Sequence, residues 1–432
     1  MAKIGGARRA RGMGVPGVDA AAMAAAVRKT PVVTLSDTEA RIDMRAMRAY
    51  RLARVRALLR EADVGAAVLL DPINIRYATG SRNHSVFVTH FPSRYLFLPA
   101  EGPVILFEGK DYVHVAAGLE TIDEVRPLVP LSFFFNGKRH EEQIGNWVRQ
   151  IADLVKKHGG GSKRLAIDKC DAPMALGLED KGVATISGQS FLERARAIKS
   201  PEEIQCMNFA MAVAEIGMAR MKEAMKPGLT ENQLWSVLYG TNIAMGGEWI
   251  DARLLSAGDR ANPWQQEASD RVIRAQELVA FDTDMVGPLG YCADISRTYF
   301  CGPGKPNATQ KEHYKLAYEE LHHNMALVRA GLSFRDMVKK SFRTPKKYHA
   351  TRYPFIAHGI GMCDEWPGIY PWQDFPGFGY DGTIEENMTL CIESYVGAEG
   401  GDVGVKLERQ VLVTKTGCVP LDKFPFEDDL LR

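Results

Sequence analysis

An apolar segment that ends in two carboxylates constrains this chain more than any other feature. Residues 278–281 read Leu-Val-Ala-Phe, which is typical of a buried strand, and Asp282 and Asp284 follow closely. In an extended chain, residues two apart point to the same face, so these two carboxylates would repel each other. Glycine and proline at 287–290 predict a tight turn that returns Asp294 opposite the first pair. The segment therefore predicts a buried hairpin whose acidic face needs a cation.

Three more polar side chains stand in apolar or glycine-rich surroundings. His358 lies in AHGIGM, Glu393 in TLCIESYVG and Glu408 in GVKLERQVLV. Each alone has an ordinary explanation as a structural histidine or as a carboxylate on the solvent face of a strand. Together with the hairpin, however, five carboxylates and one imidazole favour a pair of divalent ions such as iron, manganese, cobalt or zinc. We therefore predict a two-metal site with these ligands: Asp282, Asp284, Asp294, His358, Glu393 and Glu408.

Length and composition narrow the class of protein. A chain of 432 residues is longer than one core usually supports, which predicts two domains. Lysine plus arginine number 54 and aspartate plus glutamate 53, a balance that argues against nucleic-acid binding. Seven scattered cysteines argue against a disulfide scaffold, and no apolar run reaches the roughly 18 residues of a membrane span. We expect a cytoplasmic enzyme that binds neither nucleic acid nor membrane.

Strand and helix patterns alternate along the first part of the chain, which predicts an α/β domain. Ser200 starts a helix, with proline next and Glu203 in place for a capping box. We therefore predict an N-terminal α/β domain at 1–199, with 1–35 as an arm, and a catalytic domain at 200–432 that makes the whole chain α/β (α+β).

These motifs resemble those of the pita-bread metalloenzymes, the creatinase and aminopeptidase P (M24-like) family. The stretches that carry the resemblance are LVAFD, GYCADISRTYF, AHGIGMCDEWPG, TLCIES and LERQVLVTKTG, with DPINIRYATG and ARAIKSPEEIQCM upstream. The resemblance covers roughly residues 40–415 and implies a creatinase-like domain followed by a pita-bread catalytic domain. It also implies that five of the six predicted ligands are metal ligands, with Glu408 bridging. Asp284 is the addition.

Departures from the peptidases of that family alter the expected reaction. Peptidases read Asp-x-Gly at the first ligand, where this chain reads Asp-Thr-Asp. Two histidines that help peptidases hold the scissile carbonyl are also replaced, the first by Trp264 or Gln265 and the second by Asp364. These losses argue against hydrolysis of proline peptides. A carboxylate base facing a metal-bound substrate suits abstraction of a proton α to a carboxyl group, followed by elimination.

That pattern is similar to the dimethylsulfoniopropionate lyases of the DddP type from marine bacteria. The resemblance implies an iron-dependent β-elimination that yields dimethyl sulfide and acrylate, with Asp364 as the base. A cationic sulfonium substrate would suit aromatic side chains. Tyr353, Trp264 and Trp366 are the candidates, although core packing is the commoner role of such residues.

Two alternatives stay open. One is an Xaa-Pro aminopeptidase or dipeptidase with a dinuclear metal site. The other is a non-catalytic pita-bread binding module, which the intact ligand set and near-neutral charge oppose. The resemblance also implies a homodimer, in which Tyr77, Arg82 or His84 would reach the neighbour's pocket.

Overall fold

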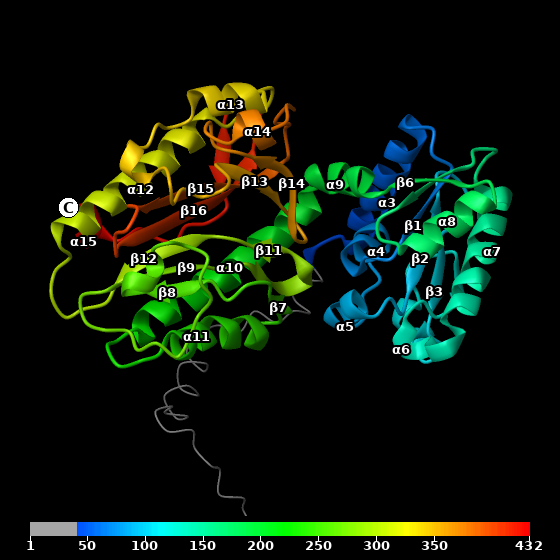
Figure 1. Ribbon diagram of the computed structural model, residues 1–432, viewed down its shortest axis with the longest axis horizontal. Coiled ribbons are helices and arrows are strands. Elements are labelled where there is room, and N and C mark those ends of the chain that lie inside the picture. The colour runs from blue at the N-terminus through cyan, green and yellow to red at the C-terminus, as the bar shows by residue number, and fades with distance from the viewer. Residues whose placement is uncertain (1–40) are drawn as a thin grey trace, which may run out of the picture.

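The structure is a computed structural model that describes residues 41–432, so the predicted arm at 1–35 lies outside the described residues. Two lobes are visible in Figure 1, with the N-terminal lobe on the right and the larger C-terminal lobe on the left. Between residues 41 and 432, no helix combines the length and the apolar composition that a transmembrane span requires.

Helices α9 (Gln189–Ala197) and α10 (Pro201–Ala224) carry the chain from one lobe to the other. Ser200 caps α10: its hydroxyl accepts from the Glu203 amide, and the Glu203 carboxylate accepts from the Ser200 amide. The predicted capping box is therefore present. We place the proposed domain division at this helix start, between residues 199 and 200.

The N-terminal lobe is built on a mixed six-stranded sheet in the order β4-β3-β2-β1-β5-β6. Its strands are β1 (Ala66–Leu69), β2 (Tyr95–Pro99), β3 (Ile105–Glu108), β4 (Glu124–Pro127), β5 (Arg164–Ile167) and β6 (Ala184–Ser187). Its other helices are α3 (Met44–Glu61), α4 (Pro72–Thr79), α5 (Ser85–His90), α6 (Phe133–Asn136), α7 (His140–His158) and α8 (Ala172–Asp180). Side chains of β1 alternate between two cores: Ala66 and Val68 pack with α7, whereas Ala67 and Leu69 pack with α3 and α4.

The C-terminal lobe contains a five-stranded antiparallel sheet, β14-β13-β15-β16-β17, and two three-stranded sheets, β12-β9-β8 and β11-β10-β7. The strands are β7 (Trp249–Ile250), β8 (Leu255–Ala257), β9 (Leu278–Asp282), β10 (Met285–Val286), β11 (Cys292–Ala293), β12 (Ser296–Phe300), β13 (Ala357–Ile360), β14 (Asp364–Ile369), β15 (Thr389–Gly397), β16 (Gly404–Val413) and β17 (Cys418–Pro420). The remaining α-helices are α11 (Glu231–Ala244), α12 (Ala308–Leu327), α13 (Phe334–Lys340), α14 (Phe375–Phe378) and α15 (Asp428–Leu431). α12 packs on β15 and β16, and β9 and β12 pack against β16. The two lobes together confirm the predicted mixed α/β class.

Buried ion pairs and a shared apolar core join the lobes. Arg51 of α3 lies 3.2 Å from a Glu203 oxygen of α10, and the Tyr291 hydroxyl donates to the same oxygen at 2.7 Å. Arg76 of α4 lies 2.7 Å from Glu248. Apolar side chains from both lobes also belong to one continuous core. The lobes are therefore held together by packing and by matched charges.

Candidate metal centre

The predicted hairpin is present, but its backbone differs from the expectation. β9 ends at Asp282, which pairs with Ser296 of β12, and the tight turn falls at Pro288–Gly290. Asp284 has a φ of 37°, in the left-handed region, so the chain is not extended through it as the pattern predicted. The bend nevertheless brings Asp284 beside Asp294, whose Oδ1 accepts from the Asp284 amide at 3.4 Å.

Sheet register brings the remaining acidic side chains to the same place. Glu393 of β15 lies directly opposite Glu408 of β16, and His358 of β13 lies opposite Cys391 of β15. Like charges directly opposite each other in a sheet destabilise it unless a cation lies between them. The strands predicted around Glu393 and Glu408 are therefore neighbours in one sheet, and their two carboxylates need a cation between them.

All six predicted ligands and Asp364 gather in this region. In each of three overlapping groups, one potential ligand atom per residue lies within 4.8 Å of the others: Asp282 with Glu393 and Glu408; Asp294 with His358, Cys391 and Glu408; and Asp284 with Asp294 and Asp364. The assignment of these residues as ligands stays a prediction.

A buried lysine that the sequence analysis missed lies in the middle of the group. The Lys406 ammonium is 2.9 Å from Asp282 Oδ2, 2.6 Å from Glu393 Oε2 and 3.2 Å from Glu408 Oε2. It also donates to the Ser296 hydroxyl at 2.7 Å. Lys406 precedes Glu408 by two residues in one strand, so both side chains share a face, and this Lys-x-Glu spacing could have revealed it.

Cys391 is the second residue that the analysis missed. Its Sγ lies 3.6 Å from the Asp294 carbonyl oxygen and 3.9 Å from Asp294 Oδ2. It precedes Glu393 by two residues in β15, which again puts both side chains on one face. The two-residue alternation of a strand could have identified this thiol from the sequence, as it could have identified Lys406.

Negative charge exceeds positive charge among the buried side chains of this region. Burial, and then the neighbouring Asp282 and Glu393, raise the pKa of Glu408 well above its usual value. Burial also opposes ionisation of Asp282, but the Lys406 ammonium overrides it and lowers the pKa of Asp282 to about 2. Asp284 Oδ2 and Glu408 Oε1 are buried and accept no hydrogen bond. A donor set of carboxylates and one imidazole with unpaired buried oxygens fits divalent cations.

His358 is oriented by its own backbone surroundings. Its Nδ1 lies 3.0 Å from the Gly359 carbonyl oxygen, which leaves Nε2 facing Glu393 Oε1 at 3.2 Å and Asp294 Oδ2 at 3.8 Å. Burial lowers the pKa of His358, but the bond to Glu393 and the charges of Asp364 and other carboxylates outweigh it and raise that pKa to about 10. The ring is therefore oriented with Nε2 toward the carboxylates, and loss of the Nε2 proton would let this nitrogen bind a cation there.

Asp364 and Glu365 begin β14 and have opposite surroundings. The Asp364 side chain is 69% exposed, with Oδ1 3.9 Å from His358 Nδ1. Glu365, by contrast, is buried. Asp364 is therefore a carboxylate at the mouth of the acidic group that solvent can reach.

The three predicted aromatic contacts fall in two places. The Lys406 ammonium lies 4.6 Å from the centre of the Tyr353 ring, so Tyr353 borders the acidic group. Trp264 belongs to a small apolar cluster that Tyr353 also joins. Trp366 instead packs on Phe334, 5.6 Å between ring centres, in the core of the C-terminal lobe. The structure brings two of the three near the acidic group.

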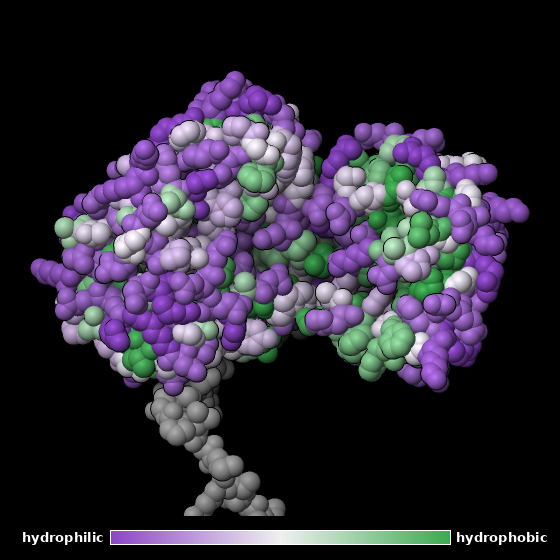
Figure 2. Space-filling view, viewed as in Figure 1, coloured by the Kyte–Doolittle hydropathy of each residue, from purple (hydrophilic) through white to green (hydrophobic). Residues whose placement is uncertain are grey.

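The three N-terminal residues that were considered for a neighbour's pocket have different surroundings. Tyr77 is buried and donates to the Ala195 carbonyl at 2.8 Å. Arg82 and His84 line a pocket of about 570 Å³ together with Trp249 and its neighbours. Figure 2 shows the surface hollowed between the two lobes.

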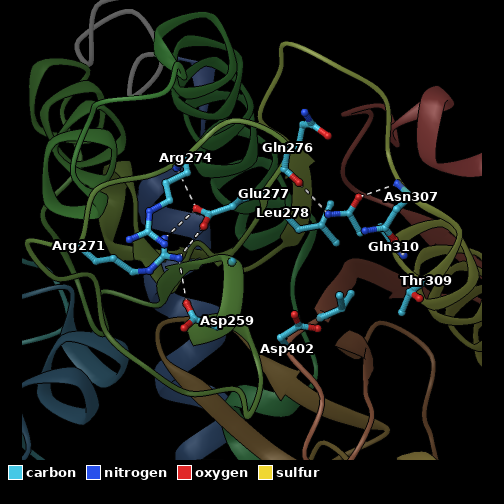
Figure 3. Close-up of a pocket in the computed structure, with 12 residues that line it drawn as sticks. Asp259, Arg271, Arg274, Gln276, Glu277, Leu278, Asn307, Thr309, Gln310 and Asp402 are labelled. Carbon is cyan, nitrogen blue, oxygen red and sulfur yellow. Dashed lines mark hydrogen bonds and ion pairs between the residues drawn. The ribbon is translucent and has the colours of Figure 1, made fainter.

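A separate pocket of about 390 Å³ lies near the start of α12 and is drawn in Figure 3. Its charges are matched within it: Arg271 contacts Glu277 at 2.7 Å and Asp259 at 2.9 Å. None of the predicted ligands lines it. We therefore assign it no part in the metal centre.

Comparisons with known proteins agree with this picture. The profile of metallopeptidase family M24 matches residues 205–415, and the Creatinase/Prolidase N-terminal domain matches residues 51–198. Two proteins named dimethylsulfoniopropionate lyase DddP are similar over 395 residues, which is 90% of this chain and 88% of each relative. The one from Roseovarius nubinhibens is 37% identical and the one from Roseobacter denitrificans is 34% identical.

Among solved structures, an Xaa-Pro dipeptidase from Bacillus anthracis has a TM-score of 0.72 at 21% identity, covering 88% of this chain and 99% of that one. That likeness concerns the fold alone. It confirms the expected creatinase-like domain followed by a pita-bread domain.

Proposed function

This chain belongs to the family of the dimethylsulfoniopropionate lyases DddP, within the M24 fold family, and from that membership we propose that it splits dimethylsulfoniopropionate into dimethyl sulfide and acrylate. One structural observation carries the proposal. Asp364, a carboxylate exposed to solvent, stands over a group of side chains suited to divalent ions. A base in that position suits removal of a proton from a carboxylic acid substrate.

The metal centre of the proposal uses six residues, three of which contact Lys406. The six residues are Asp282, Asp284, Asp294, His358, Glu393 and Glu408. Two divalent ions bound there would supply a Lewis acid that stabilises negative charge on the substrate carboxylate. We propose iron, with manganese, zinc and cobalt as the alternatives.

Asp364 takes the proton in this mechanism. Its carboxylate removes the proton from the carbon next to the substrate carboxyl group, and that C–H electron pair forms the double bond of acrylate. The C–S bond breaks and its electron pair leaves with sulfur as neutral dimethyl sulfide. Because Asp364 is 69% exposed, the proton can pass to solvent and restore the base.

Other side chains prepare the site. Lys406 keeps Asp282 ionised, and the Gly359 carbonyl orients His358. We propose that Tyr353 and Trp264 border the sulfonium group. The Lys406 ammonium already lies over the Tyr353 ring, which supports this ring as a surface that attracts cations. A cytoplasmic homodimer is part of the same proposal.

The test is direct. Purified protein loaded with iron(II) is incubated with dimethylsulfoniopropionate, and headspace dimethyl sulfide and dissolved acrylate are quantified. We expect equal amounts of the two products, and a loss of about 10³-fold in rate for Asp364→Ala with unchanged metal content. Absence of dimethyl sulfide from the loaded wild-type protein would falsify the proposal.

The same preparation separates the alternatives. An Xaa-Pro dipeptide is offered with manganese or cobalt in place of iron. Rapid cleavage would replace the lyase with a peptidase. A purified protein that takes up no metal under any condition would favour the non-catalytic binding module instead.

A further inference from the structure

Two carboxylates at the mouth of the metal centre carry negative charges that the cations of the centre would not balance. The proposed ligands carry five carboxylates, and Lys406 with two divalent ions would supply five positive charges. The centre itself would then be neutral. Asp364, the proposed base, and Asp251 add negative charge beside it. The mechanism gives Asp251 no role.

Asp251 is fixed next to the centre by strand pairing. β7 pairs with β10 so that Trp249 lies opposite Val286, and the Asp251 amide then donates to the Asp284 carbonyl at 2.9 Å. This bond continues the ladder one step and sets Asp251 across from Asp284. After burial and nearer carboxylates, the charge of Asp251 also contributes to the raised pKa of Asp284 and of Asp364. Asp251, Asp284 and Asp364 therefore lie together at the mouth of the centre.

An aromatic residue holds Asp251 in place. The Trp249 indole N–H donates to Asp251 Oδ1 at 2.6 Å. Burial raises the pKa of Asp251, and the Trp249 bond opposes this. Trp249 also lines the cleft between the lobes, so a molecule arriving from solvent can reach it. Among the described residues 41–432, no basic side chain contributes to the environment of Asp251. A fixed carboxylate of this kind beside an indole has the two features that attract organic cations.

We propose that Asp251, held by Trp249, is a specificity-determining residue that binds the cationic group of a zwitterionic substrate whose carboxylate lies at the metal centre. This inference rests on the proposed function, because it takes the substrate to be a small onium carboxylate. It adds the element of recognition: Asp251 selects the positive charge, whereas Asp364 performs the chemistry.

A matched pair of ligands that differ in one atom isolates the charge, with binding measured on the metal-loaded Asp364→Ala background to prevent elimination. In 3-(trimethylammonio)propionate a quaternary nitrogen stands where 4,4-dimethylpentanoate has a carbon, and the two molecules otherwise have the same shape. Calorimetric binding of both to this Asp364→Ala parent and to the parent that also carries Asp251→Asn gives a preference for the cation in each protein. We expect Asp251→Asn to reduce that preference about tenfold and to leave the affinity for 4,4-dimethylpentanoate, whose tail is uncharged, nearly unchanged.

Two further variants of the same parent complete the design. Asp180→Asn removes the same charge at the last residue of α8, in the other lobe, and should leave the preference at the value of the parent. Trp249→Phe keeps a ring but removes the N–H that fixes Asp251, so it should reduce the preference by a smaller factor. Metal content and circular dichroism of all variants should match the parent. An unchanged preference in Asp251→Asn, or a parent without any preference, overturns the inference.

Turnover distinguishes this inference from the proposed function. With dimethylsulfoniopropionate, Asp251→Asn should raise KM about tenfold with kcat nearly unchanged. A preference for the cationic ligand in the parent, with no dimethyl sulfide released by wild type, contradicts the function and supports the recognition role. Release of dimethyl sulfide with the same KM in Asp251→Asn and wild type supports the function and contradicts the recognition role.

Discussion

Two buried groups of carboxylates in this molecule solve the cost of burial in different ways. At the junction of the lobes, Glu365 lies 3.1 Å from Arg196 and 2.8 Å from Lys199, and Glu203 lies 3.2 Å from Arg51. Arg196 and Lys199 lower the pKa of Glu365 although burial alone would raise it. Every carboxylate there has a basic partner, which is how structural ion pairs tolerate burial.

The metal centre has no such balance. Of the five proposed ligand carboxylates, three contact the ammonium of Lys406, and within the described residues 41–432 three of their buried oxygens accept no hydrogen bond. Burial of a carboxylate is therefore not by itself evidence of function. A cluster of several buried carboxylates with too few basic partners is the sign, because an added cation can satisfy them together where a lone carboxylate would take up a proton. Four predictions test this comparison.

Glu408→Ala should have the largest effect. Glu408 belongs to two of the three groups of ligand atoms, so its loss affects both proposed ions. We expect metal content to fall by at least half and dimethyl sulfide release to fall about 10³-fold. Elemental analysis and headspace assay measure the two effects. Glu399→Ala, an exposed carboxylate beyond β15, is the control; a Glu408→Ala protein with full metal content would end the assignment of this residue.

Glu365→Ala probes the other side of the comparison. The change leaves Lys199 buried without its partner and leaves Arg196 with Glu193 as its one remaining salt-bridge partner among residues 41–432, which costs about 3–5 kcal/mol of unfolding free energy. Denaturant unfolding measures the loss, and the folded fraction should retain its metal. The exposed pair of Glu312 with Lys347 provides the control, since Glu312→Ala should cost less than about 1 kcal/mol. Loss of metal from Glu365→Ala would blur the distinction between the two groups.

Removal of metal should destabilise the protein through the centre alone. A ligand present at a hundredfold excess over its Kd stabilises the folded state by about 3 kcal/mol, so chelation should lower the unfolding free energy by that amount. Glu365→Ala should show the same increment and Glu408→Ala a smaller one. Equal increments in all three proteins would mean that the ions bind elsewhere.

Glu320 offers a third case, a carboxylate that has no basic partner among residues 41–432. It lies on α12 and accepts from the Ser394 hydroxyl at 2.7 Å, and burial raises its pKa to about 7. Its neutral form is favoured in the folded state, so the stability it contributes is present at low pH and is lost as the pH rises from about 4.5 to about 7.

Glu320→Gln removes that loss. We therefore expect the variant to be more stable than wild type by about 1–3 kcal/mol above pH 8, with the difference shrinking as the pH falls toward 4.5. Thermal unfolding of both proteins across this range measures it. A difference that is constant with pH would mean that Glu320 does not titrate with folding.

The sequence anticipated the acidic residues of the centre better than the way they are held. Periodicity and turn signals located the strand that ends at Asp282, the turn after it and the apolar strands around Glu393 and Glu408. Lys406 was overlooked although its two-residue spacing from Glu408 could have revealed it, and only tertiary structure brings it to Asp282 and Glu393. The bend at Asp284 was missed because a left-handed residue leaves no trace in an alternating pattern.

By itself, the sequence determined the local elements and the demand for a cation. Ser200 starts its helix because its capping box forms within four consecutive residues, from Ser200 to Glu203. Carboxylates in apolar strands need partners wherever those strands go. Tertiary structure decided which partners each one found. Asp364 and Glu365 are adjacent and both acidic, yet one faces solvent at the metal centre and the other meets Arg196 and Lys199. Those contacts join residues more than 160 positions apart, and only the packing of the two lobes brings them together.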